Sequence, residues 1–270
     1  MIFLTYFTDN LNVDFLSSIT YNFKLRKFEV FRRIKMKLIK KILFVTAVIC
    51  CCSSVFAQKK EKETSVENEY LNDVDGDIIM GLANADDLDS KLVALQYLQD
   101  ALDNGNTSET IIQALDQLAG EGLINPARAN GRLVNNFPEV RRQACLLMAK
   151  VKTEHSVNTL ISIAIADNEP MVVAAAVKSL GEIGINENDE TVAAIAFANK
   201  RNQYLNPTSS LAMEVLDAYE KLAPNTENKR LMVDSITGIS SNYRYVTVVR
   251  QKALKVLKNI SSSGSNKNAK

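Results

Sequence analysis

The chain has 270 residues, of which 46% are hydrophobic and 23% are charged, with 32 basic residues, 31 acidic residues and one histidine. Four cysteines, ten glycines and five prolines are too few for a disulfide-rich scaffold, a collagen or a low-complexity disordered chain. A single histidine excludes a zinc site built from several histidines, so His155 is the only imidazole available for catalysis or for pH sensing.

Residues 36–57 have the three-part layout of a secretory signal peptide. A basic stretch at 36–41 precedes an apolar run at 42–52, and the small residue Ala57 precedes Gln58. The apolar run is shorter than the roughly 20 residues that a membrane-spanning helix needs. We therefore predict cleavage between Ala57 and Gln58, and a mature protein that is periplasmic or secreted.

Two alternatives remain open at this end of the chain. The cysteines in the apolar run would suit a lipoprotein signal if one of them followed the cleavage site and carried the lipid, which would anchor the protein to a membrane. Residues 1–35 precede a methionine that could itself start translation, so they are interpreted as an upstream extension or as a long n-region of the signal. The residues concerned are Cys50, Cys51, Cys52, Met1 and Met36.

Removal of residues 1–57 changes the charge and the cysteine content. The segment holds nine basic and three acidic residues, so the mature chain is acidic overall, and Cys145 is its one cysteine. A lone cysteine cannot form an internal disulfide. Residues 58–125 hold four basic and fifteen acidic residues, whereas residues 227–270 hold nine basic and two acidic ones. The ends of the mature chain therefore carry opposite charge.

The mature chain is predicted to be all-α. Residues 58–65 and 261–270 are polar or low in complexity and are predicted to be a flexible leader and a disordered tail. Between them, residues 66–260 show apolar residues at helical spacing and no strand-like alternation. We expect five antiparallel helix pairs, with first helices near 66–83, 107–122, 155–166, 189–203 and 227–239 and second helices near 88–102, 138–151, 170–183, 207–222 and 247–260.

The second helices contain an internal repeat. The segment 140–148 recurs at 172–180 and 249–257, with weaker copies at 92–98 and 211–216. The spacing between copies is 32 to 50 residues, which is typical of an α-solenoid. The alanines at the equivalent positions are Ala94, Ala144, Ala176, Ala212 and Ala253.

The repeat resembles the HEAT-repeat family. Two segments carry the resemblance, Pro-x-Val-Arg-x-x-Ala-x-x-x-Met from Pro138 and Pro-Met-Val-Val-x-x-Ala-x-x-x-Leu-Gly from Pro170, the second preceded by the turn at 167–169. The resemblance implies a solenoid of about five HEAT-like helix pairs whose intra-repeat turns form a ridge that binds proteins.

The sequence offers few groups for catalysis. Residues 73–77 look like the start of a calcium loop, but Ile78 stands where that loop needs glycine and Asn84 where it needs a glutamate. Cys145 is expected to be a buried thiol, and His155 either a solvated loop residue or a pH-sensitive contact. We predict no catalytic residue, no metal site and no cofactor.

Aromatic and arginine residues gather in the turns inside the repeats. These residue types are frequent at protein interfaces, although aromatic side chains at such positions can also pack against the start of a helix. The 124–137 turn is long enough to be functional or to hold an extra helical turn. The candidate partner-binding residues are Phe137, Arg128, Arg132, Tyr204, Tyr243, Arg244 and Tyr245.

The expected function is that of an exported, non-catalytic protein-interaction scaffold with protein partners and no nucleic acid. One alternative is a structural subunit of a cell-envelope assembly, in which the acidic end of one copy meets the basic end of another through Lys252, Lys255 and Lys258. A maturation factor associated with an enzyme is a further alternative, supported by analogy with repeat folds alone.

Overall fold

The computed structural model describes residues 66–124 and 126–265. The predicted extension, signal peptide and leader, with Cys50, Cys51 and Cys52 and the Ala57–Gln58 cleavage site, lie outside the described residues, as does the tail from 266. Thr64–Lys270 forms one compact unit. None of the helices described is long and apolar enough to cross a membrane.

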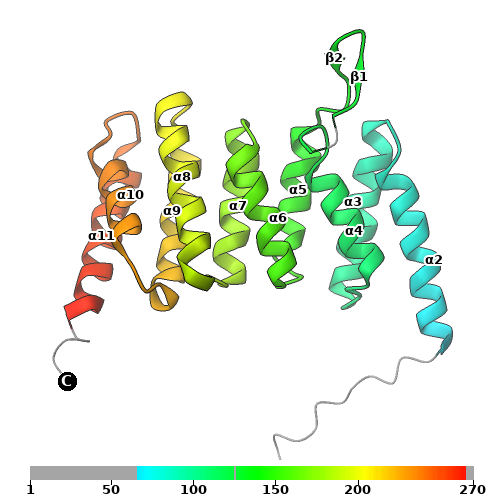
Figure 1. Ribbon diagram of the computed structural model, residues 1–270, viewed down its shortest axis with the longest axis horizontal. Coiled ribbons are helices and arrows are strands. Elements are labelled where there is room, and N and C mark those ends of the chain that lie inside the picture. The colour runs from blue at the N-terminus through cyan, green and yellow to red at the C-terminus, as the bar shows by residue number, and fades with distance from the viewer. Residues whose placement is uncertain (1–65, 125, 266–270) are drawn as a thin grey trace, which may run out of the picture. The chain divides into compact units, whose positions relative to one another are not determined.

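Five helix pairs make up the described part of the chain, as predicted (Figure 1). Two short 3₁₀ helices, η1 (Glu187–Asp189) and η2 (Ala223–Asn225), lie in the turns that follow α7 and α9. The first helices are α2 (Val66–Ala83), α4 (Glu109–Ala119), α6 (Glu154–Ala166), α8 (Glu190–Leu205) and α10 (Arg230–Ser241). The second helices are α3 (Leu88–Asp103), α5 (Pro138–Met148), α7 (Pro170–Ile183), α9 (Ser209–Leu222) and α11 (Thr247–Ser265).

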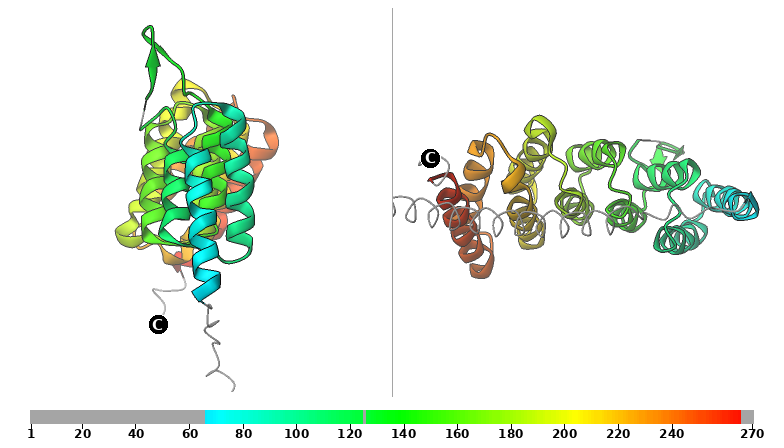
Figure 2. Two further views of the ribbon diagram at one scale, coloured as in Figure 1. Left: turned by 90° about the vertical axis from the view of Figure 1, so that its right-hand side faces the viewer. Right: turned by 90° about the horizontal axis from the view of Figure 1, so that it is seen from below.

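The helices stack in two layers. The second helices pack in series, α3 on α5, α5 on α7, α7 on α9 and α9 on α11, and the first helices form the other row, with α2 on α4, α6 on α8 and α8 on α10. Figure 2 shows the two rows from below. This serial packing is the all-α solenoid that the repeat predicted.

Small side chains allow the second helices to approach closely. The alanines at the five equivalent repeat positions are all completely buried: Ala94, Ala144, Ala176, Ala212 and Ala253. Helices α7 and α9 approach each other closely at Gly181, where an added Cβ atom would lie 2.7 Å from the Cα of Ala218. The alanine repeat therefore marks the positions at which one pair packs on the next.

The helix ends agree with the sequence except at a few positions. Pro138 and Pro170 occupy first-turn positions, where the missing N–H is of little consequence, and Gly184 ends α7 in the left-handed conformation. Pro207, which was expected to begin a helix, lies two residues before the start of α9. The last helix, α11, continues to Ser265, five residues beyond its expected end and into the segment predicted to be a disordered tail.

Candidate functional site

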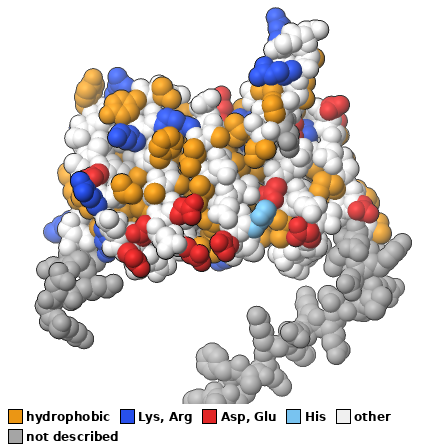
Figure 3. All heavy atoms as spheres, viewed as in Figure 1, with side chains coloured by type: hydrophobic (Ala, Val, Ile, Leu, Met, Phe, Trp, Pro, Cys, Tyr) orange, Lys and Arg blue, Asp and Glu red, His pale blue; other side chains and the backbone are white. Residues whose placement is uncertain are grey.

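The turns inside the repeats form one edge of the array, called the upper edge here, and the turns between repeats form the opposite, lower edge. In Figure 1 the upper edge runs along the top and carries the projecting strands β1 and β2. Acidic side chains gather along the lower edge of the face shown in Figure 3, whereas hydrophobic and basic side chains are frequent in its upper half. On this face, the two edges therefore differ in chemistry. The upper-edge turns comprise residues 84–87, 120–137, 167–169, 206–208 and 242–246.

The long turn after α4 contains a β-hairpin, so the extra helical turn considered for this segment is wrong. Strand β1 (Arg128–Ala129) pairs antiparallel with β2 (Arg132–Leu133). Asn130 and Gly131 connect them with φ angles of 52° and 77°, which is the signature of a two-residue type I′ turn. The Asn-Gly pair was visible in the sequence, but the strands are too short to show alternation. Arg128 and Arg132 are both exposed on this hairpin.

The base of the hairpin is held by polar contacts. Asn135 accepts a hydrogen bond from the backbone N–H of Ala127 at 2.8 Å and donates from Nδ2 to Oε1 of Glu121 at 2.8 Å. Glu121 itself is buried and forms an ion pair with the buried Lys91, with 2.9 Å between Nζ and Oε2. Because a buried charge needs a partner, this pair fixes the turn to the first repeat.

A second buried ion pair continues this polar network into the third repeat. Arg141 donates from Nε to Oδ2 of Asp167 at 2.7 Å, and its Nη1 donates to the backbone carbonyl of Glu121 at 3.1 Å. Arg201 of α8 donates to the carbonyl oxygens of Ile165 and Asp167. The network thus ties the upper-edge turns of neighbouring repeats together. Neither ion pair was predicted from the sequence. A charged residue beside an apolar helical stripe, such as Arg141 after Val140, could have indicated a buried charge.

The predicted aromatic residues of the upper edge separate into exposed and buried ones. Tyr204 is 75% exposed and Tyr243 is 84% exposed. The turn after α10 lies close to the start of α9, since the backbone N–H of Val246 donates to Oγ of Ser209, the first residue of α9, at 3.2 Å. Leu205, which was not singled out from the sequence, is 73% exposed beside Tyr204. Together these side chains form an apolar surface at the upper edge of the last two repeats.

Two of the candidate aromatics pack inward instead. Tyr245 is 3% exposed and belongs to the hydrophobic core, so it is not available as a surface contact, in contrast to its neighbours Tyr243 and Arg244, which are exposed. Burial raises the pKa of Tyr245 to about 12. Phe137 is partly buried and packs against the core at the start of α5, which agrees with the helix-stapling interpretation.

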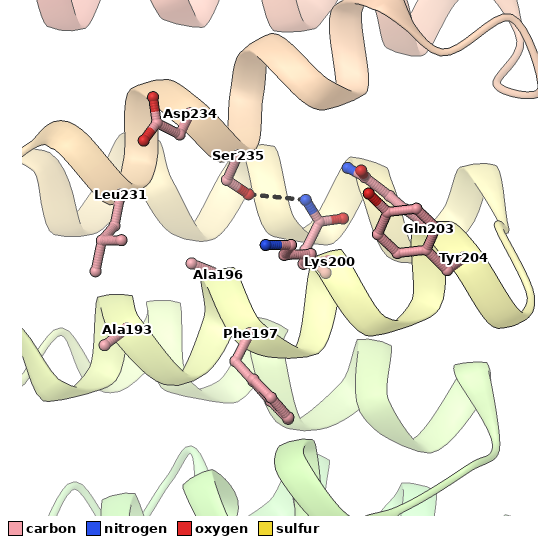
Figure 4. Close-up of a pocket in the computed structure, with 10 residues that line it drawn as sticks. Ala193, Ala196, Phe197, Lys200, Gln203, Tyr204, Leu231, Asp234 and Ser235 are labelled. Atoms are coloured by element: carbon pink, nitrogen blue, oxygen red, sulfur yellow. Dashed lines mark hydrogen bonds between the residues drawn. The ribbon is translucent and has the colours of Figure 1, made fainter.

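A groove between α8 and α10 opens beside this exposed surface and has a volume of about 430 Å³. In Figure 4, Leu231 extends from α10 toward α8, while Phe197 extends from α8 away from α10. Asn199 donates to Oγ of Ser235 at 2.7 Å across the two helices. The groove is lined by Ala193, Ala196, Phe197, Asn199, Lys200, Gln203, Tyr204, Leu231, Asp234 and Ser235.

The groove combines features suited to a peptide or helix of another protein. Ala193 and Ala196 are small, so the two helices leave space between them at these positions. Leu231 offers an apolar contact between the helices, and Phe197 offers one on the other side of α8. Lys200 and Asp234 contribute one charge of each sign. Phe197 and Leu231 were not predicted from the sequence. An exposed apolar residue within a helix cannot be distinguished from a core residue before the positions of the neighbouring helices are known.

The titratable residues singled out from the sequence are dispersed. His155, in the first turn of α6, is 60% exposed and pairs with Asp116 of α4 at 2.6 Å from Nε2 to Oδ2, so the contact that the pH-sensitive interpretation requires is present. The Asp116 carboxylate, through this hydrogen bond and its charge, raises the pKa of His155 above its ordinary 6.5. Cys145 is completely buried, and its desolvation raises the thiol pKa strongly.

Residues 73–77, which look like the start of a calcium loop, are part of helix α2. Asp75 and Asp77 are exposed on α2, and Gly76 between them is buried against Thr110 of α4. Among residues 66–124 and 126–265, no group of three or more histidine, cysteine, aspartate or glutamate side chains is placed to hold a metal ion.

Comparison with known proteins agrees with this architecture. No curated protein matches the chain. Residues 131–202, from the hairpin turn through most of α8, match the family model of HEAT repeats. The match supports the HEAT-repeat resemblance for the central repeats, and the described part of the chain is an all-α, HEAT-like solenoid.

Proposed function

We propose that the protein is an exported, non-catalytic scaffold that binds a protein partner at the upper edge of its last two repeats and in the adjoining α8–α10 groove. HEAT repeats commonly mediate protein–protein interaction, which supports a scaffold function in general. The observation that carries the more specific proposal is the surface formed by Tyr204, Leu205 and Tyr243, which lies beside the groove with Phe197 and Leu231.

The exposure of these side chains supports a binding role. When a partner covers large apolar residues that were exposed to water, the free energy of binding becomes more favourable by about 25 cal/mol per Å² of apolar surface removed from water. Tyrosine also supplies a hydroxyl group that can pair at the rim of an interface, and it is among the residues most frequent at interface hot spots. Tyr204 and Tyr243 therefore serve as the anchors of the proposed interface.

The packing beneath the surface supports a preformed site. Tyr245 anchors the turn that presents Tyr243 by packing into the core, and Asn199 links α8 to α10 through Ser235. A surface held in place in this way loses little conformational entropy when the partner binds.

We further propose that Arg128 and Arg132 make a second, separate contact with the same partner. The hairpin projects from the upper edge, and both guanidinium groups are exposed on it. The apolar residues Ile124 and Val134 near its base are also exposed. The hairpin thus offers the charged and apolar groups that a second contact with the same partner would use.

The test compares partner capture by the wild-type protein and by the variant Tyr204→Ala/Tyr243→Ala, with Val74→Ala/Val93→Ala as the matched control. All four residues are exposed, so both variants should keep the wild-type stability within about 0.5 kcal/mol. We expect recovery of a specific partner to fall at least tenfold with the tyrosine variant alone. Unchanged recovery would contradict the proposed surface.

Export is tested separately. The signal at 36–57 predicts a mature N-terminus at Gln58. N-terminal sequencing of the protein from the periplasm or medium checks this cleavage, and a lipidated cysteine at position 50, 51 or 52 would instead establish the lipoprotein alternative.

A further inference from the structure

We propose that copies of the chain associate head to tail, with the exposed face of α11 in one copy docking against the groove between α2 and α3 of the next. These surfaces are distinct from the upper edge and the α8–α10 groove, so the inference is independent of the proposed function. It rests on three properties of the terminal repeats: their unpartnered helices, their exposed apolar residues and their opposite charge.

Within residues 66–124 and 126–265, the two terminal helices of the second row have a neighbour on one side only. In the serial packing of the second helices, α5, α7 and α9 each lie between two others, whereas α3 packs on α5 and α11 packs on α9. End repeats of a solenoid usually carry a polar outer face, because nothing covers them. The exposed apolar residues at both ends of this array differ from that pattern, and a contact that covers them would explain their presence.

The N-terminal repeat presents an apolar groove with acidic borders. Ile78 of α2 and Tyr97 of α3 are each about half exposed and line a groove of about 310 Å³ between the two helices. Asp75 and Asp100 line the same groove. The remaining lining residues are Ile79, Ala101, Asn104 and Asn106.

The C-terminal helix presents the complementary features. Val248 and Leu254 of α11 are 65% and 58% exposed, although Val249, Ala253 and Val256 on the same helix are buried in the core. Lys255 and Lys258 are also exposed on α11. Lys255 directly follows Leu254 and Lys258 lies one helical turn beyond Leu254, so positive charge accompanies the apolar surface.

The described exposed charges of the α2–α3 end are acidic, and the charges of α11 are basic. Every exposed charged side chain described between residues 74 and 108 is an aspartate, since Lys91 is buried in its pair with Glu121. In contrast, no acidic residue follows Asp234, so α11 carries only basic charges, of which Lys252 is already bonded to Asp217. Opposite charges steer two surfaces together and disfavour the pairing of like ends.

Continuity of the stack sets the geometry of the contact. An α3 from a second copy would follow α11 as α11 follows α9, and the second-helix layer would continue across the interface. A contact between two different surfaces of the same chain is heterologous, so it adds copies in one direction and produces chains or a closed ring. The occupant of the α2–α3 groove is therefore a second copy of this protein.

Sedimentation velocity of the purified protein at low and high salt is the first test. We expect the mean mass to rise with concentration in about 20 mM salt and to return toward the monomer in about 500 mM salt, because exposed charges are screened. A protein that stays monomeric at every concentration in low salt would overturn the proposal.

Charge reversal separates a specific contact from general attraction. Lys255→Glu/Lys258→Glu and Asp75→Lys/Asp100→Lys should each remain monomeric, because the charged side chains that would meet across the contact then have the same sign. The chain with all four changes has the wild-type net charge and should associate again. Lys178→Glu/Lys221→Glu, which changes the net charge equally at other exposed sites, should associate like the wild type. Failure of the four-fold variant to associate, with its helical content and melting temperature unchanged, would contradict head-to-tail pairing.

Photocrosslinking locates the contact directly. Leu254 is replaced by benzoylphenylalanine, and the cross-linked peptides are identified by mass spectrometry between isotope-labelled and unlabelled copies. We expect cross-links from α11 to peptides of α2 or α3 in the other copy. Cross-links between copies that involve only other helices would overturn the assignment of the groove.

Discussion

The guanidinium group of Arg141 and the carboxylate of Asp167 form a buried ion pair that joins the second repeat to the third, with 2.7 Å between Nε and Oδ2. Both side chains are less than 5% exposed. Nη1 of Arg141 also bonds to Oδ1 of Asn136 at 2.9 Å, and Oδ1 of Asp167 accepts from the N–H of Glu169 at 2.9 Å. The pair therefore fixes two upper-edge turns at once.

Removal of one member of this pair should be strongly destabilising. Arg141→Met leaves the Asp167 carboxylate buried without its cation, and such changes lower the free energy of unfolding by about 3–5 kcal/mol. The neighbouring Arg142→Met, which breaks a partly exposed pair with Glu139, should change it by less than about 1 kcal/mol. Urea denaturation of both variants measures the difference. Equal losses of unfolding free energy in the two variants would show that the buried pair contributes no more to stability than the pair with Glu139.

The contact between His155 and Asp116 should make stability depend on pH. The folded-state pKa of His155 is raised above its ordinary 6.5 by the Asp116 hydrogen bond and charge, with a smaller contribution from Glu109. A raised pKa means that the stabilisation is complete below about pH 6.5 and is lost as the pH rises through the folded-state pKa. Its size should stay below about 1 kcal/mol, because His155 is largely exposed.

NMR titration of the imidazole measures this pKa. Asp116→Asn should return it toward 6.5, and the stability difference between wild type and Asp116→Asn should be greatest at acidic pH. Thr159→Val removes another hydrogen bond to the same carboxylate and serves as the control, since that bond does not titrate with His155. A His155 pKa that is the same with and without Asp116 would contradict the contact.

Gly181 is expected to be intolerant of a larger side chain. A Cβ at this position would lie 2.7 Å from the Cα and 2.9 Å from the Cβ of Ala218, so Gly181→Ala would force α7 and α9 apart. Overpacking of this kind costs about 1–3 kcal/mol. At Gly81 of α2 the added Cβ meets nothing within 4 Å, so Gly81→Ala should instead stabilise by up to about 1 kcal/mol through helix propensity. Thermal unfolding of the two variants should shift in opposite directions.

Cys145 should react slowly with thiol reagents in the native protein. Its side chain is completely buried, and desolvation raises its pKa, so little thiolate is present at neutral pH. Addition of a denaturant should raise the labelling rate by orders of magnitude, as followed with a chromogenic disulfide. Rapid native labelling at position 145, identified by peptide mapping, would show that the α5 packing opens readily.

The sequence by itself determined the helix pairs and their order. Apolar periodicity, first-turn prolines such as Pro138 and Pro170, and the repeated alanines are local signals that act within one or two helical turns, so they place the helices without knowledge of the neighbours. The repeat also determined the stacking, since the same small residue recurs where each pair meets the next. All five alanines proved to be buried, as at Ala176.

The tertiary structure decided which side chains stay accessible. Tyr243 and Tyr245 are two residues apart in the same turn, yet one is exposed and the other lies in the core, because the packing of α11 on α10 admits only one of them. The Lys91–Glu121 pair joins residues thirty positions apart, and the α8–α10 groove is lined by residues of two helices that are not consecutive in the chain. Composition and spacing constrain contacts near in sequence, whereas burial and surface shape depend on which distant helices meet.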